Sequence, residues 1–201
     1  MGRSYLLNEY LVIVFCVTLF GLQHSGLSAL RIKSRIIDKW GVSAYANIYK
    51  VTSIIALVPP FLSLNFWDWF YFIRSLDPLN LVYFLIAVTL IVAGATIAVA
   101  ASRVLSVSTV ADMRTDRKPE LVTGGIYRRV RHPLYLATIL LFLALIALYP
   151  FPRIIVFSLS FCVYVLIGAR LEERKLIVRY GQEYLDYKKK AGFMLPSLRK
   201  R

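Results

Sequence analysis

The sequence is poor in the residues that build metal centres and covalent cross-links. It has two histidines, His24 and His132, and two cysteines, Cys16 and Cys162. Both cysteines lie inside long apolar stretches, so we expect them to pack as small apolar side chains rather than to form a disulfide. Two separated histidines provide no clustered metal-binding motif. The sequence therefore predicts no metal site.

Long polar stretches are also scarce. Hydrophobic residues make up 58% of the chain, and the mean hydropathy is +0.62, whereas about 45–50% is usual in soluble domains. Five apolar stretches are each about as long as the roughly 17–25 residues that cross a bilayer. They are residues 10–27, 47–64, 78–101, 133–149 and 152–171. Too little polar sequence remains to cover a soluble core, so we expect an all-α integral membrane protein. It would form one domain over residues 1–201 with five transmembrane helices.

Acidic residues are few, with 11 Asp and Glu against 25 Lys and Arg and a net charge of +14. Counted between the apolar stretches, with Lys50, Arg153 and Arg170 at their ends assigned to the adjoining loops, Lys and Arg number one, five, one, seven, one and ten from the N-terminus to the C-terminus. This alternation follows the positive-inside rule for five spans, with the N-terminus outside and the C-terminus in the cytoplasm. Residues 31–46 also alternate basic and apolar side chains, which predicts an interfacial amphipathic helix. The basic surplus therefore indicates membrane lipids as partners and no nucleic acid.

The fourth and fifth spans are joined by residues 149–152, a connection that allows only a tight hairpin. They must be antiparallel neighbours, so their cytoplasmic ends meet. His132, at the start of one span, and Glu172, at the end of the other, are predicted to lie at the same depth.

Residues 124–135 place a basic, polar cluster at the start of the fourth span. Pro133 suits the first turn of a helix, and the free N–H groups of that turn, with Arg131 and His132, predict an anion site. Across the hairpin, Glu172 and Glu173 offer acceptors for hydroxyl groups or a cation. A ligand with a carboxylate, a diol and a positive charge would satisfy both sides, and S-adenosylmethionine has all three.

A second interpretation needs no cofactor. The arginines would bind lipid headgroups, and Glu172 and Glu173 would pair with Arg170 and Arg174. The residues alone leave both interpretations open and slightly favour the second. His24, near the cytoplasmic end of the first span, is likewise open. Its side chain either forms a hydrogen bond with a neighbouring helix or lines a polar, substrate-binding cavity.

The tail, residues 172–201, predicts one or two amphipathic helices with natural stops at Gly181 and Gly192. Tyr180, Tyr184 and Tyr187 have the spacing of one helical face. They would either pack on the membrane surface or form a lid over the cytoplasmic side.

Several of these segments together resemble one family. Residues 121–135 (LVTGGIYRRVRHPLY), the pair Glu172-Glu173, residues 180–187 (YGQEYLDY) and Leu195-Pro196 are similar, in order and spacing, to the isoprenylcysteine carboxyl methyltransferase and phospholipid methyltransferase superfamily. The resemblance implies a membrane methyltransferase that binds S-adenosylmethionine in a cytoplasmic pocket. The loop 102–132 would form that pocket, and the C-terminal amphipathic helices would close it. The implied cofactor-binding residues are Leu121, Val122, Tyr127, His132, Tyr135 and Glu172. In the chemistry, Arg131 would steer the acceptor, and Glu173 would order it or take its proton.

The expected acceptor is a lipidic or small apolar molecule: an isoprenylcysteine-like carboxylate, a phospholipid amine or a small thiol. Residues 24–29 (HSGLSA) are similar to relatives that methylate small thiols and to nitric-oxide-reductase-associated membrane proteins. Some family members carry an arginine shortly before the final Leu-Pro element, but residues 191–196 contain none, which disfavours a carboxylate acceptor. Two alternatives remain: a non-enzymatic lipid-binding or small-solute transport protein of the same fold, and a reductase. The reductase follows from membrane sterol reductases, which share a similar C-terminal region and bind NADPH.

Overall fold

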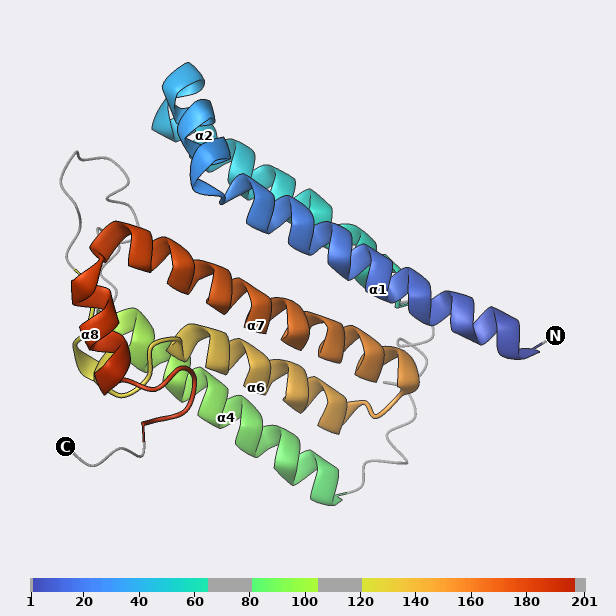
Figure 1. The fold of residues 1–201 in the computed structure, drawn as a ribbon. Helices are drawn as coiled ribbons and strands as arrows, with labels where there is room; N and C mark the ends of the chain where they lie inside the picture. The colour runs from blue at the N-terminus through green and yellow to red at the C-terminus, as the bar shows by residue number, and fades with distance from the viewer. Residues whose placement is uncertain (1, 65–80, 105–120, 198–201) are drawn as a thin grey trace. The chain divides into compact units, whose positions relative to one another are not determined.

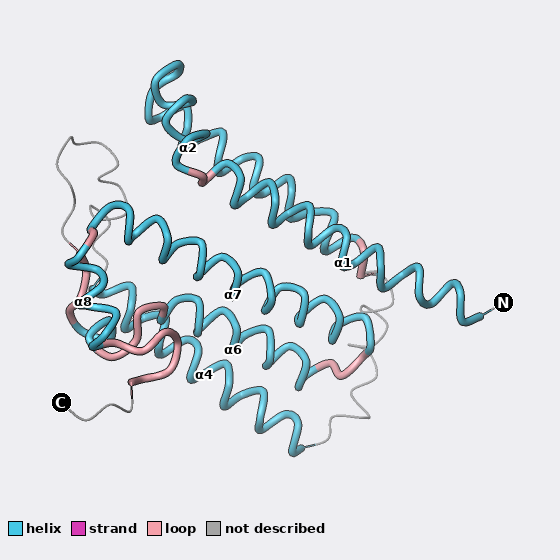
Figure 2. Tube along the Cα trace, in the orientation of Figure 1, coloured by secondary structure: helices cyan, strands magenta, loops and turns pink. Residues whose placement is uncertain are grey.

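The computed structural model describes residues 2–64, 81–104 and 121–197, and these residues are predominantly helical (Figures 1 and 2). The elements are α1 (Gly2–Leu27), α2 (Leu30–Leu62), α4 (Leu81–Val104), the short 3-10 helix η1 (Gly125–Arg128), α6 (Pro133–Leu148), α7 (Pro152–Tyr180) and α8 (Gln182–Lys190). The predicted all-α fold is confirmed for these ranges, in which the extended pairing is limited to a parallel bridge between Val130 and Gly192.

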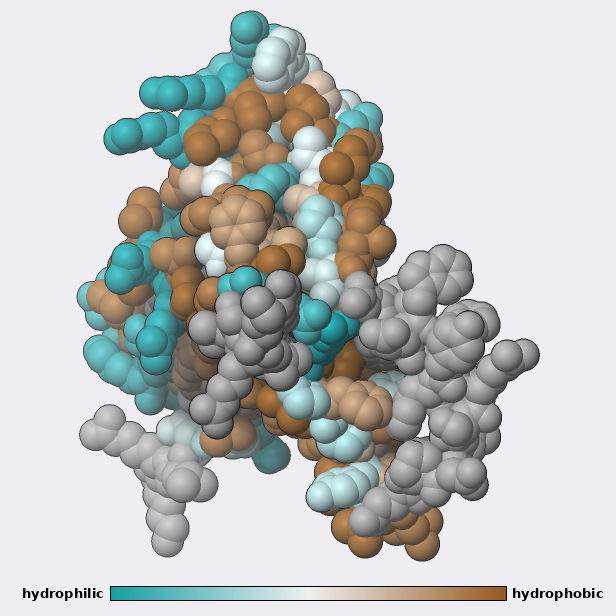
Figure 3. All heavy atoms as spheres, turned by 90° about the vertical axis from the view of Figure 1, so that its right-hand side faces the viewer, coloured by the Kyte–Doolittle hydropathy of each residue, from teal (hydrophilic) through white to brown (hydrophobic). Residues whose placement is uncertain are grey.

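Four of these helices are long and apolar enough to cross a membrane: α1 from Asn8, α2, α4 and α7. The helix α6 is equally apolar but has only 16 residues. Large apolar side chains are exposed along α4, among them Leu81, Val82 and Leu85, and Figure 3 shows brown, hydrophobic side chains on the face that it views. A helix that is apolar all round suits a lipid environment. A multi-pass membrane protein is therefore supported, whereas the count of five spans stays a prediction.

The helix α2 differs from the sequence-based expectation of a separate amphipathic segment. It includes residues 31–46 together with the second apolar stretch, and its backbone leaves the helical region at Gly41, with φ +82° and ψ 168°. Glycine adopts a positive φ without the steric penalty of a Cβ atom. The bend thus lies at Gly41, inside the segment 31–46, and not at the boundary near residue 46 that the sequence pattern indicated.

The chain divides into two compact units, residues 1–88 with 142–164 and residues 89–141 with 165–201. In the first unit, α1 packs with α2 and with the adjoining parts of α6 and α7. Its core consists of Ile13, Val17, Phe20, Leu64, Ile154, Phe157 and Phe161. The rings of Phe142 and Phe161 stack with centroids 5.0 Å apart, so the α6–α7 hairpin is packed as predicted. The expectation of a single domain over residues 1–201 stays a prediction.

The second unit contains α4, the start of α6, the end of α7 and α8. The helices α4 and α6 approach closely at Gly94, where a Cβ atom would lie 3.2 Å from the carbonyl oxygen of Ala137. Small residues permit such close contact between membrane helices. This unit also contains the segments on which the resemblance to the methyltransferase superfamily depends: residues 121–135, Glu172-Glu173 and the tail.

The tail is built differently from the expected arrangement. The helix α7 continues beyond residue 171 to Tyr180 and ends at Gly181, whose φ is +59°. The three tyrosines therefore do not share one helical face, because Tyr180 belongs to α7 whereas Tyr184 and Tyr187 belong to α8. Tyr184 and Tyr187 are buried with Ala191 in a small core, and Tyr180 packs against it. The predicted stop at Gly181 is confirmed.

Candidate active site at the start of α6

The loop before α6 is shaped by a glycine turn. Gly125 has φ +55°, and a Cβ atom there would lie 2.5 Å from Cγ2 of Val104. Glycine is thus required both by the backbone conformation and by the available space. The turn leads through η1 to residues 130–132, and the carbonyl of His132 accepts the first hydrogen bond of α6, from the N–H of Leu136 at 3.0 Å.

The C-terminal tail pairs with this loop through its backbone. The N–H of Arg131 donates to the carbonyl of Gly192 at 2.9 Å, and the N–H of His132 donates to that of Phe193 at 3.1 Å. The N–H of Gly192 donates in return to the carbonyl of Arg129 at 2.9 Å. The ring of Phe193 meets that of His132 edge to face, with centroids 5.0 Å apart. Residues close to the C-terminus therefore fix the backbone that carries Arg131 and His132.

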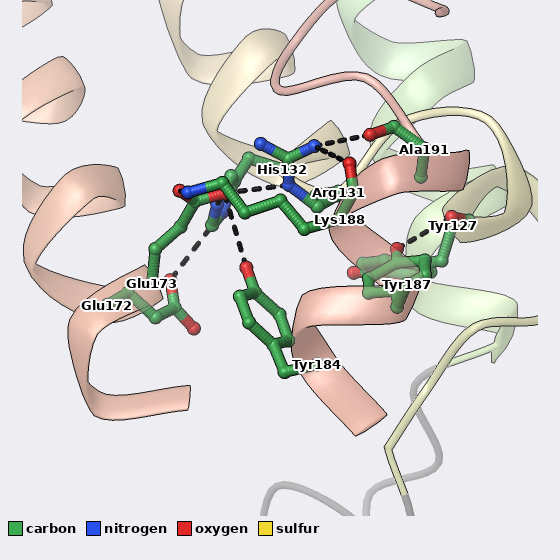
Figure 4. Close-up of polar contacts among 9 residues, drawn as sticks. All are labelled: Tyr127, Arg131, His132, Glu172, Glu173, Tyr184, Tyr187, Lys188 and Ala191. Carbon is green, nitrogen blue, oxygen red and sulfur yellow. Dashed lines mark hydrogen bonds and ion pairs between the residues drawn. The ribbon is translucent and has the colours of Figure 1, made fainter. Parts of the chain in front are cut away.

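Glu173 lies at the centre of a buried charged network (Figure 4). It is 7% exposed, and its carboxylate accepts hydrogen bonds from Nε of Arg131 at 2.7 Å and Nζ of Lys188 at 2.8 Å. The hydroxyl of Tyr184 is a third donor, at 3.3 Å. Arg131 also donates to the backbone carbonyls of Ala191 and Lys188. The network thus links α7, α8, the tail and the loop before α6.

His132 lies beside this network and is buried. Its Nδ1 is 3.9 Å from a carboxylate oxygen of Glu172, which confirms the predicted proximity of these two residues. Its Nε2 is 3.5 Å from Glu173 and has no well-formed hydrogen bond to any described residue. Burial lowers the pKa of His132 against the opposing effect of Glu172 and Glu173. His132 is therefore neutral at neutral pH, and the side chain of Glu172 is 43% exposed beside it.

The tyrosines and the Leu-Val pair lie around the same loop. The ring of Tyr135 meets that of His132 edge to face, with centroids 5.5 Å apart. Tyr127 is buried, and its carbonyl accepts a hydrogen bond from the hydroxyl of Tyr187 at 2.6 Å. Burial raises the pKa of Tyr127 to about 12, so its phenol is uncharged. Leu121 packs against the core of α8, and Val122 beside it is half-buried.

The second unit thus brings together every residue that the sequence singled out there: Leu121, Val122, Tyr127, Arg131, His132, Tyr135, Glu172 and Glu173. His24 belongs to the first unit and is described separately below. Lys188 and Phe193 were not predicted from the sequence to be partners of this site, and Tyr184 was predicted only as a possible lid residue. Their signal was present only as the amphipathic pattern of the tail. Among the residues described, no group of three His, Cys, Asp or Glu side chains is arranged to hold a metal ion.

The lowered pKa of His132 predicts a pH dependence of stability. Between the folded and unfolded pKa values, the unfolded chain binds more protons, so stability is retained above about pH 6.5 and lost as the pH falls below it. We expect melting temperatures of the wild type to fall more steeply below pH 6.5 than those of His132→Gln. Thermal melts of both proteins between pH 5 and pH 8 measure this difference. Subtracting the two pH profiles cancels the contribution of the titrating groups that both proteins share. Parallel pH profiles would show that His132 does not titrate as its burial implies.

Comparisons with known proteins converge on one family. Residues 82–183, about half of the chain, match the family model described as phospholipid methyltransferase. The chain is 30% identical to a methanethiol S-methyltransferase of Pseudomonas deceptionensis, over 94% of this chain and 74% of that protein. It is 26% identical to a methanethiol S-methyltransferase of Crocosphaera subtropica, over 100% of this chain and 80% of that protein. A methanethiol S-methyltransferase 1 of Bradyrhizobium diazoefficiens is 36% identical over 39% of this chain and 27% of its own length. No solved structure matches.

Proposed function

Because this chain belongs to the phospholipid methyltransferase family, we propose that it is a membrane methyltransferase that uses S-adenosylmethionine to methylate a small thiol. Three of its relatives are named for methanethiol. The tail segment beside His132 supports an uncharged acceptor, because residues 191–196 contain no cationic side chain and place Phe193 against the imidazole. Among the carboxylate, amine and thiol acceptors, a thiol agrees best with the names of the relatives and with the uncharged tail segment beside His132.

The observation that carries the proposal is the buried His132 next to the half-exposed Glu172. Nε2 of His132 lies 3.5 Å from Glu173 and has no well-formed hydrogen bond to a residue that the structure describes. A buried polar atom without a partner is costly, so a bound ligand is a reasonable means of satisfying it. His132 and the first-turn N–H groups of α6 would hold the carboxylate of the cofactor. Glu172 would accept hydrogen bonds from the ribose diol, by the logic known for dinucleotide sites. The faces of Tyr127 and Tyr135 would lie near the positive charge, and the backbone of Leu121 and Val122 would complete the site.

S-adenosylmethionine would supply a methyl group already activated by its sulfonium. The protein then mainly orients the acceptor and excludes water, effects worth up to about 7–11 kcal/mol. Arg131 and Glu173 were expected to steer the acceptor and take its proton. Their mutual ion pair and the additional donors on Glu173 favour a different role. We propose that both residues anchor the tail and thereby position His132.

The proposed topology has five spans, with α6 as the short fourth one. The loop 102–132 and the tail would face the cytoplasm, and the N-terminus would lie outside. The charge distribution supports this orientation, and membrane lipids would be the surrounding partners. A short α6 fits a span in a locally thinned bilayer or one flanked by polar anchors.

We expect purified protein in detergent to bind S-adenosylhomocysteine saturably and to convert methanethiol to dimethyl sulfide when labelled S-adenosylmethionine is supplied. His132→Ala and Glu172→Gln should each weaken S-adenosylhomocysteine binding by about ten- to a hundredfold, since each removes one charged or charge-assisted hydrogen bond. Calorimetric titration measures this loss. Arg153→Ala is the control, because Arg153 pairs with Glu9 in the first unit.

The same titration separates the alternatives. No binding at millimolar S-adenosylhomocysteine would favour a non-enzymatic lipid-binding or transport protein. Binding of NADPH in its place would favour a reductase. Normal S-adenosylhomocysteine binding by both His132→Ala and Glu172→Gln would show that the cofactor site lies elsewhere in the chain.

A further inference from the structure

A second polar cluster lies in the first unit, where α1 packs against α2. Nε2 of His24 is 2.6 Å from the hydroxyl of Tyr49, and its Nδ1 is 3.0 Å from Oγ of Ser53. Next to His24 in the sequence, Gln23 donates from Nε2 to Oγ1 of Thr52 at 2.8 Å. Polar and ionisable groups inside apolar helices are costly and tend to mark functional sites. This cluster belongs to no part of the site at the start of α6.

Aromatic rings surround the imidazole of His24. The ring of Phe20 stacks on it at 5.4 Å between centroids, and that of Tyr49 lies at 4.8 Å. The ring of Tyr164, from α7, lies at 6.5 Å from that of His24 in a T-shaped arrangement. Gly21 makes room for this ring, since a Cβ atom there would lie 2.7 Å from Cδ2 of Tyr164. Three helices therefore contribute to one polar site with aromatic walls.

One acceptor in the cluster is left over. Both ring nitrogens of His24 have partners, but Oε1 of Gln23 is buried and has no hydrogen-bond partner among the described residues. Purely structural polar networks in apolar surroundings are normally satisfied throughout, because an unmade hydrogen bond is expensive there. The Gln23 oxygen thus indicates a ligand that donates a hydrogen bond. Sulfur also makes favourable contacts with aromatic rings, at about 5 Å.

We propose that Gln23, His24, Tyr49 and Tyr164 form a binding site for the small thiol acceptor, an inference that rests on the function proposed above. The thiol S–H donates to Oε1 of Gln23, and the sulfur lies against the aromatic rings. Hydrogen bonds to Tyr49 and Ser53 hold the His24 ring in place as one wall. The apolar surroundings favour short alkanethiols and disfavour thiols that carry a charged group.

The test uses ethanethiol as a probe and dimethyl sulfide, which has no S–H group, as its matched control. Ligand-observed NMR on the full chain in lipid nanodiscs, without cofactor and against empty nanodiscs, should show selective binding of ethanethiol. Gln23→Leu should weaken this binding by about tenfold, because it removes the hydrogen bond between the thiol S–H and Oε1 of Gln23. It should raise the KM for methanethiol by a similar factor, with kcat and S-adenosylhomocysteine affinity unchanged.

Thr52→Val provides the control for a merely structural role. It removes the same hydrogen bond between Gln23 and Thr52 but keeps Oε1 of Gln23. Binding of ethanethiol should survive Thr52→Val and be lost in Gln23→Leu. Equal losses in the two variants, or none in either, would overturn the thiol site. Tyr164→Leu, which removes an aromatic wall from another helix, should also weaken ethanethiol binding and serves if Gln23→Leu does not fold.

Failure of the site and failure of the proposed function give different results. Selective ethanethiol binding that depends on Gln23, without methyl transfer or S-adenosylhomocysteine binding, would overturn the methyltransferase proposal and leave the thiol site standing. Methyl transfer to methanethiol with an unchanged KM in Gln23→Leu and Tyr164→Leu would overturn the site and leave the function standing.

Discussion

Glu173→Gln is expected to destabilise the protein by about 3–5 kcal/mol, the usual effect of breaking a buried ion pair by removing one partner. The substitution leaves Arg131, whose side chain is only 7% exposed, without its counter-charge. It also weakens the hydrogen bonds from Tyr184 and Lys188 that hold α8. Thermal melts in detergent and resistance to denaturation by sodium dodecyl sulfate measure the loss.

The adjacent Glu172→Gln is the matched control, because it makes the same chemical change one residue earlier. The side chain of Glu172 is 43% exposed and lies 3.9 Å from His132, so the melting temperature of Glu172→Gln should stay close to that of the wild type. Its effect should appear in S-adenosylhomocysteine affinity instead. Two glutamates next to each other in the sequence would then have separable roles, one in binding and one in anchoring.

A double substitution tests whether the uncompensated charge is the cause. Arg131→Met combined with Glu173→Met removes both buried charges, and replacing a whole pair by apolar groups is often close to neutral. Lys188 is partly exposed and can turn to solvent. We therefore expect the double variant to melt above Glu173→Gln. If Glu173→Gln melts like the wild type but loses methyl transfer, Glu173 acts in the chemistry and the anchoring role is wrong.

The pairing of His132 with Glu172 could be predicted from the sequence because it depends on connection length. Residues 149–152 allow only a tight turn between two long apolar helices, so the distal ends of the hairpin must meet. Helical periodicity and the proline at position 133 then place each side chain to within about a turn. The apolar character of the spans follows from composition in the same way.

The role of the tail could not be predicted in this manner. Arg131 reaches the carbonyls of Lys188 and Ala191, which lie 57 and 60 residues further along the chain. Such contacts depend on where Gly181 turns the backbone between α7 and α8, and no local pattern specifies that direction. Periodicity shows that Glu172 and Glu173 face different sides of α7, since neighbours differ by about 100°. Which of the two faces inward is decided by α8.

Gly192→Ala is expected to detach the tail and lower S-adenosylhomocysteine affinity by tenfold or more. A Cβ atom at this position would lie 1.9 Å from the carbonyl oxygen of Leu195 and 2.8 Å from the amide nitrogen of Ser197. Both are backbone atoms, so the chain itself must move. This movement would break the hydrogen bonds that join Gly192 to Arg129 and Arg131. Each backbone hydrogen bond has a net value of about 1 kcal/mol, so the two together exceed the roughly 1.4 kcal/mol that corresponds to a tenfold change in affinity.

The loss should have a second readout that does not depend on ligand binding. The basic residues 188–190 are exposed but belong to the last turn of α8. Release of the tail should loosen that turn, so trypsin should cut there faster in Gly192→Ala than in the wild type. Gly26→Ala is the control, because a Cβ atom at Gly26 would have no neighbour within 4 Å in the part of the chain that the structure describes, and it should leave both proteolysis and affinity unchanged. Faster cleavage with unchanged affinity would show that the tail closes over the loop without positioning His132. Wild-type behaviour in both assays would show that the pairing of residues 129–132 with the tail does not support the site.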